Sequence, residues 1–531
     1  MAPQRQFVPF VSAMLAILLS VPGCLKVGPD FSKPAPPVLS NWLESNDERV
    51  KGDSANYRAW WEAFGDPCLT RTINMAYSQN LSLKIAAVRV IEARAELGIS
   101  VGNLYPQTQQ FNPAVSFNRL STYSYSSVEA GAVAFPHSFW QDQLNLNIAW
   151  ELDFWGKYRR GVESADANLR STVADYDSAL VTLTADAATF YIQIRVIEKR
   201  LAIARENLET QKESLRIAET RFEGGTTSER DVQQAKSQLF NTQATIPVLE
   251  AQLRQSKDAL CVLLGIPPDE LTDVLTGTSQ IPNPPPSVAI GIPADLLRRR
   301  PDIRSAELQA AGQCAQIGVA KADLFPAFSV GGFFGPVATR VDGTNLAQMF
   351  NFAKASQTTL GPSVQWNFLN YGRITNNVRF QDARFQELLL IYKNTVLRAQ
   401  QEVEDALAAF LRYQENAQSL ALSVDAAKRS LDLAFIQYSQ GSTDFTTVLV
   451  AQGALLNVQD NLAAAMGSIA TNLAGIYRAL GGGWEVRSGE DILSPEIKEA
   501  MAQRTNWGNL LSPAAYMPPS DNQPDVRPPD W

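Results

Sequence analysis

The chain has 531 residues, of which 45% are apolar and 19% charged, and its net charge is -8 at pH 7. This length suffices for several domains or for one large elongated domain, and the composition is typical of folded protein. The negative charge disfavours a nucleic-acid partner, because phosphate binding requires a basic surface.

A single histidine, His137, is present. We predict it to be a loop residue, because one histidine cannot build a multi-histidine metal site, and no other residues suggest a histidine-assisted nucleophile. The sequence therefore predicts neither an enzyme nor a metal centre.

The N-terminal residues 1–23 have the pattern of a secretory signal, with a basic start followed by a short apolar run. Residues Val21–Cys24 resemble a bacterial lipobox, although Pro22 is an unusual occupant. We expect Cys24 to be acylated and to become the mature N-terminus; the alternative is a plain signal peptide with a structural cysteine. No run of about 20 apolar residues occurs, so we expect no membrane-spanning helix.

Three further cysteines, Cys68, Cys261 and Cys314, have no metal-like spacing. We predict that they are buried as small apolar residues. One disulfide among them is the alternative, and their pairing stays open.

Four segments alternate between apolar and polar residues, at 111–117, 144–154, 328–334 and 360–368. The second segment is the most regular, with Leu144, Leu146, Ile148, Trp150, Leu152 and Phe154 on one face. A period of two indicates β-strands with one apolar face. We predict four strands in two pairs.

Each strand pair is followed by a long segment in which apolar residues recur at steps of four and three. Such a sustained seven-residue repeat is typical of coiled-coil packing. The first helix, from Lys157 to Phe222, would measure about 100 Å, and its return helix, ending near Gly265, about 55 Å. Pro247 should kink that return helix or end a segment of it.

The two long helices end in similar sequences, "RFEGGTTSERDV" from Arg221 and "QYSQGSTDFTTV" from Gln437. The predicted turns of the two helical hairpins consist of Gly224, Gly225 and Thr226 in the first and of Gly441 and Ser442 in the second. Glycines supply the backbone freedom that ends a helix, and the hydroxyl residues that follow can cap the next one.

The similarity between the halves extends beyond these turns. Trp150 and Trp366 stand 216 residues apart in matching contexts, and "LGISVGNLYP" from Leu97 matches "IGVAKADLFP" from Ile317 at an offset of 220. This indicates a tandem duplication. We divide the chain into a signal peptide (1–23), a lipidated segment (24–68), a first repeat (69–284), a Pro-rich crossover (285–301), a second repeat (302–484) and a C-terminal tail (485–531). We expect the end of this tail, from Met517 on, to be loose and solvated.

The predicted helices run away from the strands and cannot cover the apolar face of the sheet. A lipid-facing barrel would solve this, because a sheet in a membrane must close to satisfy its backbone groups. Four strands are too few for closure, so several copies would have to join. The aromatic residues expected to form a girdle at the membrane interfaces are Trp140, Trp150, Phe154, Trp155, Trp366, Phe368 and Tyr371.

Several segments resemble outer-membrane efflux proteins of the TolC and OprM type, in the NodT-like lipoprotein subgroup. They include "CLKVGPDFSKP" from Cys24, "IPADLLRRRPDIRSAE" from Ile292 and "YRALGGGWE" from Tyr477. The resemblance covers nearly the whole chain beyond the signal. It assigns the run Arg298–Arg300 to a family element, whereas the run alone is best interpreted as a solvated helix end.

The resemblance implies an α+β membrane protein that forms a homotrimer, with a twelve-stranded β-barrel continued by an α-helical tunnel. Extracellular loops would lie at 118–140 and 335–358. The hairpin turns would meet a periplasmic adaptor, which holds an inner-membrane pump. The chain would be a passive conduit for drugs and toxic small molecules in the outer membrane of a Gram-negative bacterium, with no cofactor except the lipid on Cys24.

The resemblance also implies a periplasmic gate of acidic or polar residues just past the turn glycines. Asp231 matches this position in the first hairpin, where it is either a gate residue or a solvated helix acid. In the second hairpin the matching positions hold Thr447 and Val450, so a second acidic ring is in doubt. Asp444 lies nearer the turn and either supplies charge or caps the helix.

Two other function classes remain open. One is a lipid-anchored periplasmic coiled-coil scaffold without a pore, which leaves the alternating strands unexplained. The other is a type I channel for exported proteins or peptides. The lipobox and the arginine-rich segment favour small-molecule efflux, but nothing identifies the cargo, and seven methionines with one histidine do not indicate a copper or silver route.

Overall fold

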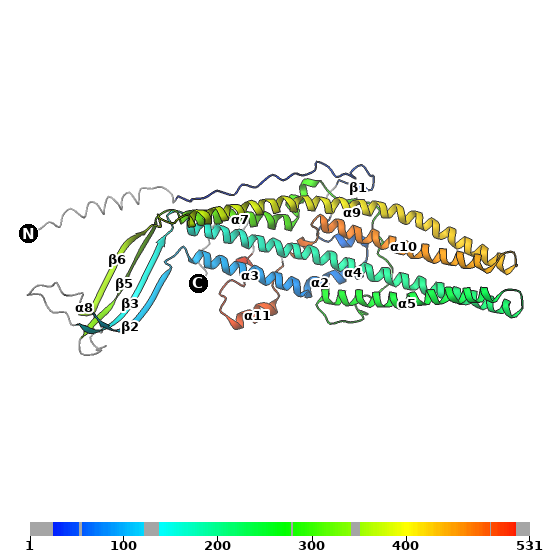
Figure 1. Cartoon of the computed structure of the whole chain (residues 1–531), viewed down its shortest axis with the longest axis horizontal. Coiled ribbons are helices and arrows are strands. Elements are labelled where there is room, and N and C mark those ends of the chain that lie inside the picture. Colours follow the sequence, from blue (N-terminus) through cyan, green and yellow to red (C-terminus); the bar gives the residue numbers. More distant parts are fainter. Residues whose placement is uncertain are drawn as a thin grey trace, which may run out of the picture.

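The computed structural model describes residues 25–52, 56–121, 137–277, 280–340, 351–488 and 490–516. The predictions for the signal peptide and Cys24 lie outside these residues. The chain is elongated, with a β-sheet at one end and two helical hairpins that extend away from it (Figure 1).

The sheet contains β2 (Thr108–Arg119), β3 (Ser138–Leu152), β5 (Ala327–Arg340) and β6 (Ser356–Gln365), all antiparallel and in the order β2-β3-β5-β6. Four strands were predicted, and four form this sheet. The predicted ends need correction, because β3 and β6 stop before Phe154 and Trp366. The chain turns there into the next helix through Gly156 and Gly372, which have φ of 76° and 82°.

The strand register places apolar side chains on one face. Leu146 pairs with Phe111 on one side and with Phe334 on the other, and directly paired residues point to the same face. These three side chains are 42%, 63% and 51% exposed within the chain.

The opposite face is mainly polar, with apolar exceptions such as Phe333 and Val337. It carries mainly amide and hydroxyl side chains, at Gln110, Asn112, Ser116, Gln141, Gln143, Asn145, Asn147, Thr339, Gln357, Thr359 and Ser363. The sheet thus separates an exposed apolar surface from a surface that suits water.

The helices continue the order of the strands. α3 (Leu81–Gly102) leads into β2, β3 leads into α4 (Lys157–Glu223), α7 (Pro301–Ala322) leads into β5, and β6 leads into α9 (Arg373–Ser439). α4 packs against α3 and α7, and α7 packs against α9. The helices therefore form a layer in the order α3-α4-α7-α9, which is the order of the strands β2-β3-β5-β6 that they join.

The two long helices each have 67 residues, about 100 Å at 1.5 Å per residue, as predicted. α4 pairs with its return helix α5 (Glu229–Leu264), and α9 with α10 (Phe445–Ala479). Pro247 lies inside α5, which continues through it. Of the two predicted effects of this proline, the end of a helical segment is therefore wrong, and the kink stays a prediction.

By length and composition, one stretch of α4 is apolar enough to cross a membrane, which differs from our expectation of no such segment. Of that stretch, 61% is buried within the chain. Its apolar character serves packing against α3, α7 and α10.

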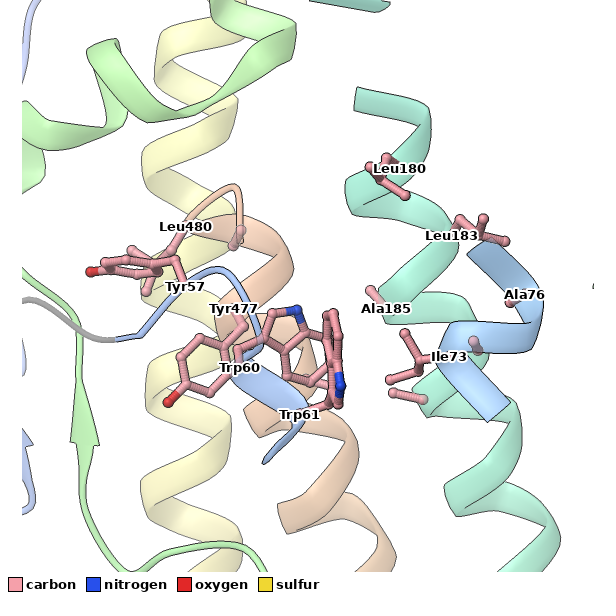
Figure 2. Packing of buried hydrophobic residues seen from close by; sticks show 14 of the residues in the cluster. Tyr57, Trp60, Trp61, Ile73, Ala76, Leu180, Leu183, Ala185, Tyr477 and Leu480 are labelled. Atoms are coloured by element: carbon pink, nitrogen blue, oxygen red, sulfur yellow. The ribbon is translucent and has the colours of Figure 1, made fainter. Parts of the chain in front are cut away.

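The main core lies in the half of the helical body that is nearer the sheet. There α2 (Pro67–Gln79) and the 3-10 helix η1 (Trp60–Phe64) pack on α4 and α10. Trp60 stacks on Tyr477 of α10, with ring centres 5.3 Å apart. Figure 2 shows Ile73 and Ala76 of α2 beside Leu183 and Ala185 of α4.

The crossover between the halves includes β4 (Val288–Ala289), which pairs with β1 (Val50–Lys51), followed by η3 (Pro293–Asp295) and α6 (Leu296–Arg299). The guanidinium carbon of Arg299 lies 3.3 Å from the ring centre of Tyr57. Arg300 is buried and donates to Glu402 and to the Ala479 carbonyl. For Arg299 and Arg300, a solvated helix end is therefore the wrong interpretation.

The C-terminal tail is packed as far as residue 516. It forms η5 (Trp484–Arg487), α11 (Pro495–Arg504) and α12 (Pro513–Tyr516), and buries Leu493, Met501 and Tyr516. The predicted loose end, residues 517–531, lies outside the described chain. Cys68, Cys261 and Cys314 are buried free thiols.

Candidate functional site

The predicted girdle residues divide between the two ends of the sheet. Trp140 pairs with Phe117 and Arg340 at the end far from the helices, whereas Trp150 pairs with Val330 near the helices. Ten residues along β3 correspond to about 33 Å, or about 23 Å across a bilayer at a tilt near 45°. That height is close to the apolar band of about 25 Å in outer-membrane barrels.

The aromatic residues at the helix end form matching contacts in the two halves. The indole nitrogen of Trp150 donates to the Leu104 carbonyl at 3.1 Å, and that of Trp366 donates to the Leu324 carbonyl at 3.1 Å. Trp155 is half-buried; it donates to the Pro326 carbonyl at 2.7 Å and stacks on Phe325, and Phe154 lies beside it. In contrast, Trp366, Phe368 and Tyr371 are exposed.

The N-terminal segment is attached at this same junction. The Val27 amide donates to the Trp155 carbonyl at 3.0 Å. Arg160 of α4, 1% exposed, donates to the carbonyls of Val27 and Gly28 and to the carboxylate of Asp30. The N-terminal segment therefore lies beside Trp155 and the start of α4, and no sequence signal indicated this role of Arg160.

Charged groups outside the strands also meet at the junction. Lys157 pairs with Asp323 at 2.9 Å. Burial would lower the pKa of Lys157, but the hydrogen bond to Asp323 and nearby carboxylates outweigh it, so the pKa is raised. Burial and the Glu151 carboxylate raise the pKa of Tyr158. Both residues keep their ordinary protonation at neutral pH.

At the far end of the molecule, the hairpin turns lie where they were predicted. Gly225 and Gly441 adopt φ of 69° and 74°, which glycine tolerates readily. The hydroxyls of Thr226 and Ser442 donate to the carbonyls of Arg221 and Gln437. Thr226 and Ser442 therefore close the preceding helix, and not the following one as we had expected, whereas Ser228 stands at the N-cap of the following helix α5.

Asp231 points back into its own turn. Its carboxylate accepts hydrogen bonds from the hydroxyls of Thr227 at 2.5 Å and Ser228 at 3.3 Å, and the residue is 5% exposed. Ser228 is the N-cap of α5, and Asp231 occupies the third helical position, as the acid does in a capping box. In this conformation Asp231 stabilises the turn and is not a solvated helix acid.

The candidates on the second hairpin are accessible. Asp444, the N-cap of α10, accepts from the Thr447 hydroxyl at 3.2 Å, without capping a backbone amide of the helix. Asp444 and Thr447 are exposed, and Val450 is 68% exposed. With Ser430 and neighbouring α10 residues they line a groove of about 410 Å³.

One contact joins the two turns directly. Arg221, at the end of α4, donates to the Tyr438 carbonyl of α9, and its guanidinium carbon lies 4.4 Å from the centre of the Tyr438 ring. Tyr438 belongs to a small apolar cluster with Ala218, Val232, Leu431, Phe445 and Val448 that unites the four helix ends. This pair could not be predicted from the sequence, because its two residues stand 217 positions apart.

Buried polar residues separate this cluster from the main core. Asn207 of α4 donates to Gln459 of α10 at 2.9 Å, and Gln452 donates to Ser214 at 2.6 Å. Buried polar layers fix the register of packed helices at a cost in stability. Apolar packing therefore contributes less at the hairpin turns than in the main core nearer the sheet.

In the part of the chain that the structure describes, no three His, Cys, Asp or Glu side chains gather as a metal site. His137 precedes β3, where its carbonyl accepts from the Leu120 amide.

Comparison with known proteins identifies the family. Residues 72–266 and 292–482 match the family model described as outer membrane efflux protein. The chain is 32% identical to nodulation protein T of Rhizobium leguminosarum bv. viciae, over 94% of this chain and 98% of that protein. It is 30% identical to the pyoverdine export outer membrane protein OpmQ of Pseudomonas putida, over 90% of this chain and 98% of that protein.

The fold agrees with this assignment. The solved structure of the outer-membrane channel OprN superposes with a TM-score of 0.79 at 32% identity, covering 87% of this chain and 100% of that one. The family resemblance inferred from the sequence is confirmed. This chain belongs to the outer membrane efflux protein family, and it is an efflux channel of the outer membrane.

Proposed function

We propose that three copies of this chain form a closed twelve-stranded barrel and a helical tunnel, and that this trimer is the outer-membrane conduit of a tripartite efflux system. The observation that carries the proposal is a sheet with an exposed apolar face, a polar opposite face and an edge strand on each side. Closing such a sheet pairs every backbone group, as a bilayer requires.

The helical layer supports the same closure. α3 and α9 lie at its two edges, and both expose large apolar side chains, namely Leu81, Ile85 and Ile99 on α3 and Phe380, Leu390, Ile391 and Leu397 on α9. Different surfaces at the two edges favour a head-to-tail association, which forms a ring when the rotation between copies closes. β2 and β6 run in opposite directions, so their pairing would be antiparallel, as in outer-membrane barrels.

We place the membrane at the sheet, between Trp140 and the aromatic residues at the helix junction. An acyl group on Cys24 would enter the inner leaflet beside that junction, because Val27 and Gly28 are held there by Arg160. The anchor adds to the affinity of the barrel for the bilayer, since a single acyl chain alone binds weakly.

The hairpins would then extend into the periplasm and meet an adaptor that connects them to an inner-membrane pump. The pump supplies energy, and the channel breaks and forms no covalent bond. Relatives are named for pyoverdine export and for solvent and toluene efflux, so small molecules are the proposed cargo class. We attribute the two similar halves to a tandem duplication.

The hairpin turns are the proposed gate. Arg221 and Tyr438 would hold the two hairpins of one chain together in the closed state, with Asp231 stabilising the first turn. Asp444, Thr447 and Val450 would line the mouth, because they are exposed on the second hairpin. Gly224, Gly225, Thr226, Gly441 and Ser442 would form the surface that meets the adaptor.

Arg221→Ala is expected to raise the single-channel conductance of the protein in a planar bilayer several-fold, because it removes the direct contact between the hairpin turns. Arg216→Ala is the matched control, since Arg216 lies on the same helix and pairs with Glu213 of that helix. If the unchanged protein and both variants conduct no current after reconstitution, the channel assignment is contradicted. Equal conductance of all three would remove Arg221 from the gate.

A further inference from the structure

We propose that Arg119 and Arg340 form a binding site for the phosphate groups of lipid A, the membrane part of lipopolysaccharide, in the outer leaflet of the outer membrane. This inference rests on the proposed placement of the sheet in that membrane, and it adds a lipid ligand that the channel function does not require. The described strands β2, β3, β5 and β6 contain two cationic residues, Arg119 and Arg340. Both stand at the strand ends that lie far from the helices (Figure 1).

Both arginines belong to the apolar face of the sheet. Arg340 pairs with Trp140 of β3, and Trp140 pairs on its other side with Phe117, which stands two residues before Arg119. Residues that pair directly, or that stand two apart on one strand, share a face. The rings of Phe117 and Trp140 are in contact, with centres 5.3 Å apart. The two arginines therefore border the aromatic residues at this edge of the proposed membrane.

The other end of the same face has a different composition. There the described strands present only apolar side chains, namely Trp150, Leu152, Phe328, Val330 and Val364. Arginines that lie in the headgroup region only to reach water are expected at both edges of the hydrocarbon layer. Cations at one edge alone indicate a partner that is present in one leaflet, and lipopolysaccharide is confined to the outer leaflet.

The spacing of the two arginines suits a ligand with two phosphate groups. Arg119 pairs with Ser138 and Arg340 with Trp140, both on β3. Two strand spacings and two residues therefore separate the arginines, which corresponds to about 12 Å between their Cα atoms. Lipid A has a phosphate at each end of a disaccharide, and guanidinium groups bind phosphate through two parallel hydrogen bonds. One lipid A can therefore contact both arginines, with its acyl chains along the apolar face.

The other charges near this surface leave it positive. Arg119 is exposed and Arg340 half-buried, and neither forms an ion pair within the described residues. Asp142 of β3, on the same face toward the middle of the sheet, is 1% exposed, and one of its carboxylate oxygens has no hydrogen-bond partner in the described chain. Lys354 belongs to α8 (Phe352–Ala355), which packs on β5. Three cations beside one buried carboxylate give a net positive surface, which attracts phosphate.

The test is native mass spectrometry of the full-length trimer in mild detergent, after incubation with purified lipid A. The double variant Arg119→Gln with Arg340→Gln should bind lipid A about tenfold more weakly than the unchanged protein, because it loses both charge-assisted contacts. The matched control is Asn118→Ala with Thr339→Ala, at adjacent positions on the polar face, and it should bind like the unchanged protein. Dephosphorylated lipid A should bind to the unchanged protein as weakly as lipid A binds to the arginine variant.

Equal binding of lipid A by the arginine variant and the control would overturn the proposed site. Phosphatidylglycerol bound as tightly as lipid A would overturn it too, because the surface would then recognise any anionic lipid. If the double variant does not assemble, Arg119→Gln and Arg340→Gln are measured singly, and unchanged binding in both has the same meaning. A trimer that binds no lipid A in any form would overturn the site and leave the channel intact, whereas a detergent-extracted monomer would contradict the proposed function itself.

Discussion

Leu146→Arg is expected to prevent assembly of the channel in the membrane, whereas Asn147→Arg leaves assembly intact. Leu146 lies near the middle of β3, about halfway between Trp140 and Trp150, and its side chain is on the apolar face. Arginine on the lipid face of a barrel costs about 2–4 kcal/mol at the bilayer midplane, or about 6–12 kcal/mol in three copies. Asn147 is the adjacent residue, on the polar face.

The measurement is the amount of heat-resistant trimer extracted from outer membranes for each variant. The comparison controls for charge, side-chain size and strand position, since only the face differs. Equal loss of trimer in both variants would show that the strand tolerates no arginine at all. Full assembly of Leu146→Arg would contradict the assignment of the apolar face to lipid.

Asp177→Ala is expected to destabilise the helical body by about 3–5 kcal/mol, because it removes a fully buried carboxylate that pairs with the buried Arg487 and with the partly exposed Arg304. Asp177 of α4 is 0% exposed. Its carboxylate accepts from Arg487 of η5, at 3.0 Å for one of two bonds, and from Arg304 of α7 at 2.5 Å. The three residues connect α4, α7 and the C-terminal segment at one point.

The matched control is Asp186→Ala on the same helix. Asp186 pairs with Arg478 at 3.2 Å in a more exposed position, and such pairs contribute about 1 kcal/mol or less. Thermal unfolding in detergent and proteolysis of the C-terminal segment check both variants. A melting temperature unchanged by Asp177→Ala, with a protected C-terminal segment, would mean that this network does not hold the segment in place.

Much of the architecture could be predicted from local patterns. Alternation in "LNLNIAWELDF" identified β3, and the apolar steps of four and three identified α4 and α9 at nearly their full length. These signals persist because each element buries one face along its whole length. The strand ends were misplaced because Phe154 and Phe368 continue the alternation past the point where the backbone turns.

The contacts that assemble the elements could not be predicted. Arg160 reaches residues about 130 positions earlier, and Arg221 reaches Tyr438 in the other half. The local sequence around an arginine in an amphipathic helix does not distinguish a solvated side chain from one that is buried against a distant carbonyl. Asp231 illustrates this for the gate, because only its three-dimensional setting shows that the carboxylate faces its own turn.

The most direct measurement of the central claim is the mass of the full-length protein extracted from membranes in mild detergent, by light scattering or native mass spectrometry. We predict three times the mass of one chain, in a particle that requires detergent to stay in solution. A monomer that remains soluble after the detergent is removed would contradict the claim that the exposed sheet faces lipid and closes with its copies around a pore.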